Sequence, residues 1–419
     1  MNKVDYFRNR FADEFYKNEF TKAIDTGRRL LYEQAHINRV GTENYVHDMY
    51  NLALAYEMAG DIESAAETYR GSAWYSSHID YEGLLFAKCL TGLATLLSDM
   101  GQGESAYFML AKACEIHLNK LSPLDPNLAD SLYNLANAAF DINMPTSALE
   151  YHLKALKIRE KTDDKVDLVN SLHSIAFIFE SSESYDEACS FARYAAEYAQ
   201  EIDDDFTYAT CCTYLGDLYS KCEKYEDALD MYCIATDEIE FVTGKEHSAY
   251  LNSVFVKATT LAKLSLHHEA IYSYQEILDI FEDKLGTRHL FYANCLRNLA
   301  IAYDNTGDSF MSKITMLDAV RIKRQLKSCA IIDVIFVFRL CLRLGLLDEA
   351  LNTLVYVLIC ARDSSWDLAQ SKNFVLSVMS AECKNEKAKF YDALEKLESS
   401  GRLESLIDYW LDWEKEGLG

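Results

Sequence analysis

The stretch Asn51-Leu52-Ala53-Leu54-Ala55-Tyr56, followed by Gly60, Ala65 and Tyr69, contains the pattern that decides the fold. A Leu-Ala pair precedes an aromatic residue, and a glycine, a small residue and a second aromatic residue come after it. Apolar residues at these spacings lie on one face of a helix, and Gly60 is suited to end that helix. The stretch therefore predicts two amphipathic helices joined by a tight turn.

The same pattern recurs along the chain, and its small residue marks the interval most clearly. This residue stands at positions 23, 65, 106, 148, 188, 228, 270, 312 and 350, which are almost evenly spaced. A unit of two helices cannot bury its own apolar face, whereas stacked units bury a continuous core. Small side chains let crossing helices approach to about 8–10 Å. The sequence thus predicts an all-α solenoid of antiparallel helix pairs, with degenerate first and last copies.

Composition agrees with long helices and narrows the possible partners. The chain has 419 residues with only 3 Pro and 16 Gly, too few for the many turns of an all-β protein. Its formal net charge of −25 disfavours nucleic acid and anionic membrane surfaces, and we expect no direct readout of bases. The basic cluster Arg321, Lys323, Arg324 and Lys327 is expected to be a solvated helix end.

The cysteines and the most apolar segments indicate a cytoplasmic protein. The 12 Cys are scattered and form no C-x-x-C motif, which favours a reducing compartment. Residues 1–6 lack the apolar core of a signal peptide. The most apolar stretch, Ala330 to Leu347, contains Asp333, Arg339 and Arg343, so we expect no membrane span.

The repeat resembles the tetratricopeptide repeat, whose core reads L-G-x-x-Y, then A-x-x-x-F, then A. Leu215-Gly216-x-x-Tyr219 with Ala228, Tyr232 and Ala235 is one such copy, and the resemblance covers roughly residues 5 to 360. The interval between copies exceeds the family's usual value of about 34 residues and is similar to that of kinesin light chains. It overlaps HEAT and armadillo repeats, which lack this pattern. The resemblance implies a right-handed superhelix of about nine helix pairs over residues 1–362.

Residues 363–419 follow the repeats and are expected to form C-terminal capping helices. An array needs a cap for its last apolar face. The segment Leu403 to Trp413, with Tyr409 and Trp410, is a candidate for that cap. It is also a candidate docking helix for a partner.

The resemblance also implies that the first helices of the pairs line a concave groove that holds a partner segment. An Asn amide both donates and accepts hydrogen bonds, so it can hold an extended peptide backbone. The alternative is that Asn is merely tolerated there as part of the repeat. The residues expected in the groove are Asn51, Asn134, Asn137, Asn170, His173, Thr213, Asp217, Asn252, Asn294, Arg297 and Asn298.

Function is expected to be binding rather than catalysis, without a cofactor or a metal. The chain lacks H-E-x-x-H, G-x-S-x-G, a Walker loop and G-x-G-x-x-G. His267-His268-Glu269 is not expected to bind a metal, because adjacent side chains on a helix point in different directions. The leading hypothesis is a scaffold or adaptor for a protein or peptide, preferably a neutral or basic one.

Two alternatives stay open. One is a peptide-sensing regulator similar to bacterial receptors that hold a signalling peptide inside such an array. Those receptors usually carry an additional N-terminal domain, whereas repeat-like sequence begins here by Phe7. The other is an enzyme or an inhibitory subunit that acts by occlusion, whose mark would be a perturbed carboxylate pair in a closed pocket.

Overall fold

The computed structural model describes residues 3–346 except 163–164, 203, 327, 329–330 and 345. Every regular element among these residues is helical. The chain divides into two compact units, of which unit 1 ends at Asp204 and unit 2 begins at Asp205. The prediction of an all-α array of helix pairs is confirmed for both units. The expected cap at 363–419, and with it the segment 403–413, lies outside the described residues.

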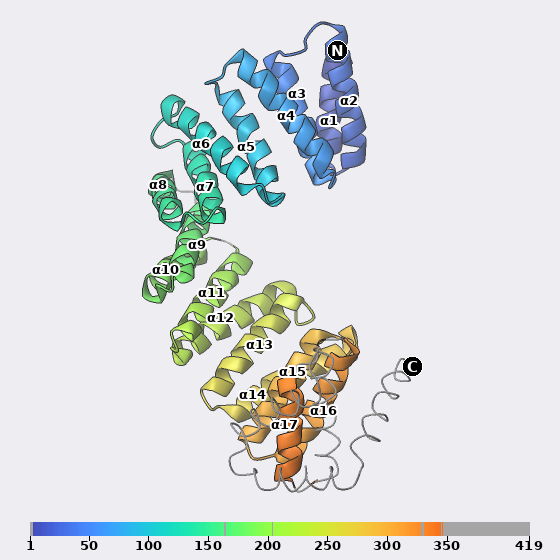
Figure 1. The fold of residues 1–419 in the computed structure, drawn as a ribbon, viewed down its shortest axis with the longest axis vertical. Coiled ribbons are helices and arrows are strands. Elements are labelled where there is room, and N and C mark those ends of the chain that lie inside the picture. Colours follow the sequence, from blue (N-terminus) through green and yellow to red (C-terminus); the bar gives the residue numbers. More distant parts are fainter. Residues whose placement is uncertain are drawn as a thin grey trace, which may run out of the picture. The chain divides into compact units, whose positions relative to one another are not determined.

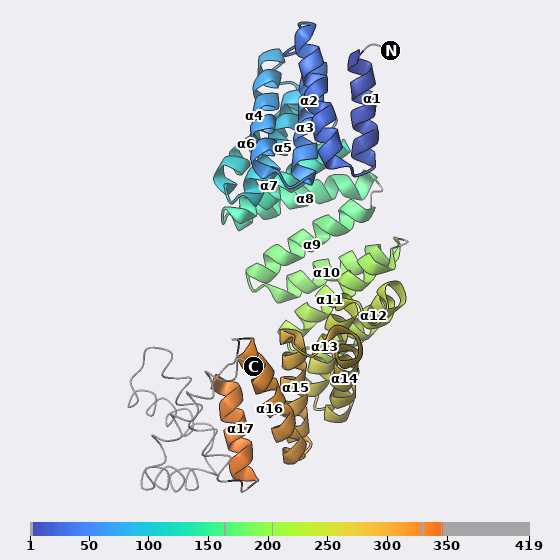
Figure 2. The same cartoon turned by 90° about the vertical axis from the view of Figure 1, so that its right-hand side faces the viewer.

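The described residues of unit 1 form five helix pairs, which follow one another along the chain (Figures 1 and 2). Its helices are α1 (Lys3–Tyr16), α2 (Phe20–His36), α3 (Glu43–Met58), α4 (Ile62–Ile79), α5 (Leu84–Asp99), α6 (Gly103–Lys120), α7 (Pro126–Asp141), α8 (Pro145–Thr162), α9 (Lys165–Ser181) and α10 (Tyr185–Gln200).

Unit 2 continues with the same arrangement. Its described elements are α11 (Asp205–Lys221), α12 (Tyr225–Thr243), α13 (Ser248–Lys263), α14 (His267–Ile280), the π-helical turn η1 (Phe281–Leu285), α15 (Leu290–Asn305), α16 (Ser309–Gln325) and α17 (Ile331–Arg343).

Within each unit, every helix packs on the one before it and the one after it. The tightest contacts join the two helices of a pair, such as α7 with α8 or α15 with α16. The second helix of each pair then packs on the first helix of the next. First helices of neighbouring pairs also touch, as α3, α5 and α7 do in succession and as α13 and α15 do. The first helices therefore form one continuous face in each unit, which we call the first-helix face.

The recurring small residue lies at the helix crossings that the sequence predicts. The seven alanines from Ala23 to Ala270 that mark the repeat are fully buried, and so is Ser312. Ser312 replaces alanine without leaving a buried polar group unpaired, because its hydroxyl donates a 2.7 Å hydrogen bond to the carbonyl of Ala300.

The turn inside each pair reverses the chain through one residue with positive φ. Gly60, Gly101 and Gly307 have φ of 80°, 76° and 87°, as the sequence predicts. In the other turns this position is taken by residues with a side chain: Asn18, Asn143, Glu183, Glu223 and Ser265. Asn tolerates positive φ well, whereas Glu and Ser do not, so the repeat geometry imposes this conformation at Glu183, Glu223 and Ser265.

Among the described residues, no helix combines the length and the apolarity that crossing a bilayer requires. Within the apolar stretch, Ile331–Arg343 form α17, where Val334, Val337 and Phe338 pack into the core of unit 2.

Candidate partner-binding face

The eleven residues predicted to bind a partner all lie on first helices: α3, α7 and α9 in unit 1, and α11, α13 and α15 in unit 2. When the copies are aligned on the buried small residue, the set falls on four positions of the repeat. Asn294, Arg297 and Asn298 represent three of these positions on α15, and Asn137 represents the fourth on α7. Steps of three and four residues keep side chains on one side of a helix. The structure thus places the predicted set on one strip of the first-helix face in each unit.

Three of these amides are open to solvent. Asn137 on α7, Asn170 on α9 and Asn252 on α13 are exposed, whereas Asn51, Asn134, Asn294 and Asn298 are half-buried. An exposed amide can form hydrogen bonds with an incoming backbone without first breaking contacts in the core.

Other members of the set hold the fold together. The Thr213 hydroxyl donates a 2.9 Å hydrogen bond to the carbonyl of Ala209 within α11. Asp217 accepts a 2.6 Å hydrogen bond from the Tyr232 hydroxyl, which ties α11 to α12. Burial, reinforced by this bond to a carboxylate, raises the pKa of Tyr232, so its hydroxyl stays a donor.

Arg297 belongs to a buried charge cluster that joins three helices. Its Nε lies 2.5 Å from Oδ1 of Asp333, whose side chain is 2% exposed. Lys323 donates a 3.0 Å hydrogen bond to Oδ2 of the same carboxylate. The cluster links α15, α16 and α17, and it shows that the expectation of a solvated basic patch was wrong for Lys323. That side chain is buried because Asp333 neutralises it.

An equivalent cluster lies at the first repeat junction. Arg8 on α1 and Gln34 on α2 both donate hydrogen bonds to the buried carboxylate of Asp48 on α3, with 2.6 Å between Arg8 Nη2 and Oδ2. In the alignment of the copies, Asp48 and Asp333 occupy the same position of the repeat. Gln34 and Lys323 likewise share a position, on the second helix of the preceding pair.

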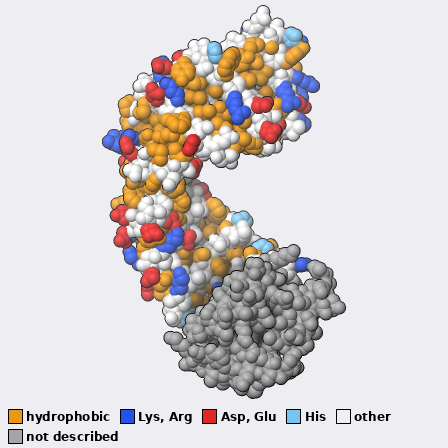
Figure 3. Space-filling view, in the orientation of Figure 1, with side chains coloured by type: hydrophobic (Ala, Val, Ile, Leu, Met, Phe, Trp, Pro, Cys, Tyr) orange, Lys and Arg blue, Asp and Glu red, His pale blue; other side chains and the backbone are white. Residues whose placement is uncertain are grey.

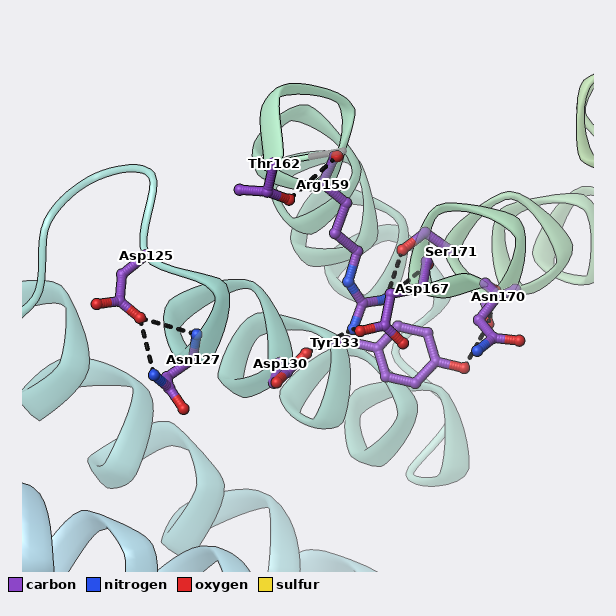
Figure 4. Close-up of polar contacts among 10 residues, drawn as sticks. Asp125, Asn127, Asp130, Tyr133, Arg159, Thr162, Asp167, Asn170 and Ser171 are labelled. Atoms are coloured by element: carbon purple, nitrogen blue, oxygen red, sulfur yellow. Dashed lines mark hydrogen bonds and ion pairs between the residues drawn. The ribbon is translucent and has the colours of Figure 1, made fainter. Parts of the chain in front are cut away.

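The junction between α8 and α9 is built on Arg159 (Figure 4). Arg159 occupies the same repeat position as Gln34 and Lys323. Its guanidinium donates to Oδ1 of Asp130 at 2.7 Å and to the hydroxyl of Ser171 at 2.7 Å. It also lies over the Tyr133 ring, 4.7 Å from the centroid. Arg159 thereby joins α7, α8 and α9 beneath the strip that carries Asn137 and Asn170.

Tyr133 connects this junction to the surface. Its hydroxyl lies 3.1 Å from that of Ser174, which hydrogen-bonds the carbonyl of Asn170 at 3.0 Å. His173, beside Ser174, is half-buried, and this burial lowers its pKa. A neutral imidazole is therefore favoured at this position.

An aromatic pair that the sequence analysis missed lies on α7 and α9, the two first helices that carry Asn137 and Asn170. Phe140 on α7 and Phe177 on α9 meet edge to face, with ring centroids 5.5 Å apart. Phe177 is 51% exposed although it is a large apolar residue. It occupies the repeat position that Asn137 holds in the preceding copy. Aligning the copies on this position would have found it.

Hydrophobic side chains reach the surface elsewhere in unit 1 as well, between scattered charges over α3 to α8 (Figure 3). Within the described part of the chain, His, Cys, Asp and Glu side chains form no group that could hold a metal ion. His267, His268 and Glu269 form the first turn of α14.

Two family models described as tetratricopeptide repeat match the sequence, over residues 128–162 and 250–324. These segments cover most of the pair α7–α8 and most of the pairs α13–α14 and α15–α16. The chain contains tetratricopeptide repeats. None of the curated proteins matches its sequence.

Solved structures with this tetratricopeptide repeat fold include two that align over 78% of the chain. One is a signal transduction ATPase with numerous domains and a tetratricopeptide repeat sensor from Pyrococcus horikoshii, at 17% identity and a TM-score of 0.58. The chain covers only 47% of that protein. The other is the apo form of RapI, covered over 99% of its length, at 13% identity and a TM-score of 0.55. At these identities the likeness shows the fold alone.

Proposed function

We propose that this tetratricopeptide repeat protein is an interaction scaffold that binds an extended segment of a partner protein on its first-helix face. The observation that carries the proposal is that the exposed Phe177 ring and the exposed amides of Asn137 and Asn170 lie on the same strip of two adjacent first helices. The repeat fold supports the same class of function, since tetratricopeptide repeats generally serve as non-catalytic scaffolds.

The chemistry of this strip suits a peptide backbone with one apolar anchor. Asn137 lies one turn before Phe140 on α7, and Asn170 lies two turns before Phe177 on α9. Each amide offers two donors and an acceptor to an extended chain, which alternates the same groups along its length. An aromatic or aliphatic partner residue packed on Phe177 would supply most of the affinity, as buried aromatic anchors do at interfaces.

Charge favours a neutral or basic partner segment. The chain carries a net charge of −25, and Asp141, which accepts a 3.1 Å hydrogen bond from Ser98, lies directly after Phe140. Complementary charge speeds association and discriminates against acidic segments. We also propose a cytoplasmic location, supported by the 12 scattered cysteines and the lack of a C-x-x-C motif, which favour a reducing compartment.

The Arg159 cluster supports the proposal by fixing the two helices that carry the strip. Asp130 and Ser171 bind the same guanidinium, so α7 and α9 are held in register from below. A binding surface that is ordered before the partner arrives loses less entropy on association.

Selection from a phage-displayed library of random peptides tests this function with the full chain as bait. A selected peptide is then titrated against Phe177→Ala and the double variant Asn137→Ala/Asn170→Ala. Loss of an aromatic anchor should weaken binding by at least about 30-fold, or 2 kcal/mol. The matched control is Phe108→Ala, which removes a ring that is 71% exposed on the second helix α6.

The titration also separates the scaffold from the alternative, a receptor for a short signalling peptide. Six extended residues span only about 20 Å, which is enough for α7 and α9 but not for the whole strip from α3 to α9. A scaffold that uses the whole strip should therefore bind a selected peptide much more weakly once it is shortened to about six residues. Full affinity at that length would favour the receptor. Equal binding by Phe177→Ala, Phe108→Ala and the unchanged chain would refute the assignment of the strip.

A further inference from the structure

The second helix α16 carries an apolar stripe on its outer side. Phe310 is 59% exposed, and Met311, Ile314 and Leu317 are 37 to 41% exposed. These residues follow one another at spacings that keep them on one side of the helix. The opposite side, with Met316, Ala319 and Val320, is the one that packs into the core of unit 2. The stripe therefore contributes little to the packing of its own repeat.

Equivalent positions of other repeats show that the fold does not require apolar residues there. Phe310 and Ile314 stand two residues before and two residues after the buried small residue. In α4, α10 and α12 these two positions hold exposed polar residues, namely Glu63 and Glu67, Asp186 and Ser190, and Glu226 and Asp230. Adjacent exposed apolar side chains in place of polar ones mark an interaction surface.

We propose that the stripe binds the same stripe on a second copy of this chain, with the two α16 helices antiparallel. The sequence of the stripe is self-complementary about Ile314, since Met311 and Leu317 stand three residues to either side. A two-fold axis at Ile314 brings Met311 to the level of the partner's Leu317, and the reverse. A two-fold interface requires such a surface, because each patch must match itself.

The charges at the two ends of the stripe fit this pairing. Arg321 stands seven residues after Ile314, and Asp308 stands six residues before it, which places both about 10 Å from the two-fold axis along the helix. Both side chains are exposed. In the antiparallel arrangement Arg321 faces the partner's Asp308, and the contact occurs twice by symmetry. A parallel pairing would instead set like charges side by side.

The stripe is small, so the dimer is expected to be weak. A stable interface uses about 20–30 residues from each partner, far more than one side of α16 supplies. Association should therefore depend on protein concentration. The stripe lies on a second helix of unit 2, whereas the proposed partner strip lies on first helices of unit 1, so the two proposals rest on different residues.

Sedimentation equilibrium of the full chain over a wide concentration range tests the proposal. The unchanged chain should form a reversible dimer, and Ile314→Glu should raise its dissociation constant by at least about 30-fold, because it places charges against each other in the centre. Tyr272→Glu is the matched control, since Tyr272 is 72% exposed at the same repeat position of α14 and should not change the constant.

A charge exchange tests the antiparallel geometry without touching the apolar residues. Arg321→Asp alone and Asp308→Arg alone should each weaken self-association. In a dimer of either variant, residues 308 and 321 carry the same charge, so both symmetric contacts become repulsive. An equimolar mixture of the two variants should form a heterodimer, since both contacts become complementary again. A concentration-independent monomer, equal effects of Ile314→Glu and Tyr272→Glu, or no recovery on mixing would overturn the proposal. The proposal would also be overturned if the chain were monomeric and Ile314→Glu lowered its melting temperature. That result would show that residues of the same chain pack on the stripe.

Discussion

Lys323 donates a 3.0 Å hydrogen bond to Asp333, and Gln34 makes the corresponding contact with Asp48 at the other end of the array. The same two repeat positions meet at His117 and Ser131, and at Arg159 and Ser171. Each junction of this kind joins the second helix of one pair to the first helix of the next. The same two repeat positions thus form a buried contact at several junctions, with different polar residues at each one.

Removing the carboxylate at the last described junction should destabilise unit 2. Asp333→Ala leaves Lys323, and part of Arg297, buried without a counter-charge, which costs about 3 kcal/mol. Urea unfolding followed by circular dichroism measures the loss. Asp318→Ala, at an exposed site on α16, is the control and should change stability by less than about 0.5 kcal/mol. Equal effects of the two variants would contradict a structural role for Asp333.

Arg159 should stabilise unit 1 in the same way that Asp333 stabilises unit 2. Arg159→Met keeps much of the side-chain volume but removes the hydrogen bonds to Asp130 and Ser171, and we expect a loss of about 2 kcal/mol. Lys157→Met changes an exposed residue of the same helix and should be nearly neutral. If Arg159→Met unfolded at the same urea concentration as Lys157→Met, the junction would not depend on this residue.

Acid should weaken unit 1 through His152. Burial, with a smaller effect of Arg159, lowers the pKa of His152 from 6.5 to about 4. The folded state therefore binds this proton less readily than the unfolded state. The stabilisation is complete above about pH 6.5 and falls as the pH drops toward 4, by about 3 kcal/mol in total.

His152→Gln isolates this effect from the half-buried His117 and His173, whose pKa burial also lowers. The variant should lose less stability than the unchanged chain between pH 7 and pH 4.5 in urea titrations. A pH dependence as steep as that of the unchanged chain would show that His152 does not cause it.

Two helical glycines should respond oppositely to a methyl group. A Cβ on Gly216 would lie 2.8 Å from the ring of Tyr232, which is fixed by its bond to Asp217, so Gly216→Ala should cost about 1–3 kcal/mol. A Cβ on Gly71 would meet only the flexible end of Met49, so Gly71→Ala should be neutral or gain up to about 1 kcal/mol from helix propensity. Melting temperatures of the two variants distinguish these outcomes, and a larger loss for Gly71→Ala would refute the contrast.

The repeat could be predicted from sequence because it depends on local spacing. A buried small residue recurs in almost every copy, and Gly60, Gly101 and Gly307 mark in the sequence the positions where the chain turns. The turns at Glu183 and Glu223 could not be recognised in this way, because tertiary packing rather than residue preference sets their positive φ.

The candidate site was only partly predictable. The spacing correctly placed its residues on first helices, but it could not show which side chains the fold itself uses. Arg297 and Asp217 have partners on other helices, and such contacts depend on how neighbouring helices pack. Phe177 was missed because an apolar residue in an amphipathic pattern is assumed to face the core.

Hydrogen exchange measured by mass spectrometry on the complex with a selected peptide tests the central claim most directly. The account predicts that the peptide slows exchange in segments of α7 and α9 around Asn137 and Phe177, while the second helices α4 and α6 exchange as in the free chain. Protection confined to the second helices, with α7 and α9 unchanged, would contradict binding on the first-helix face.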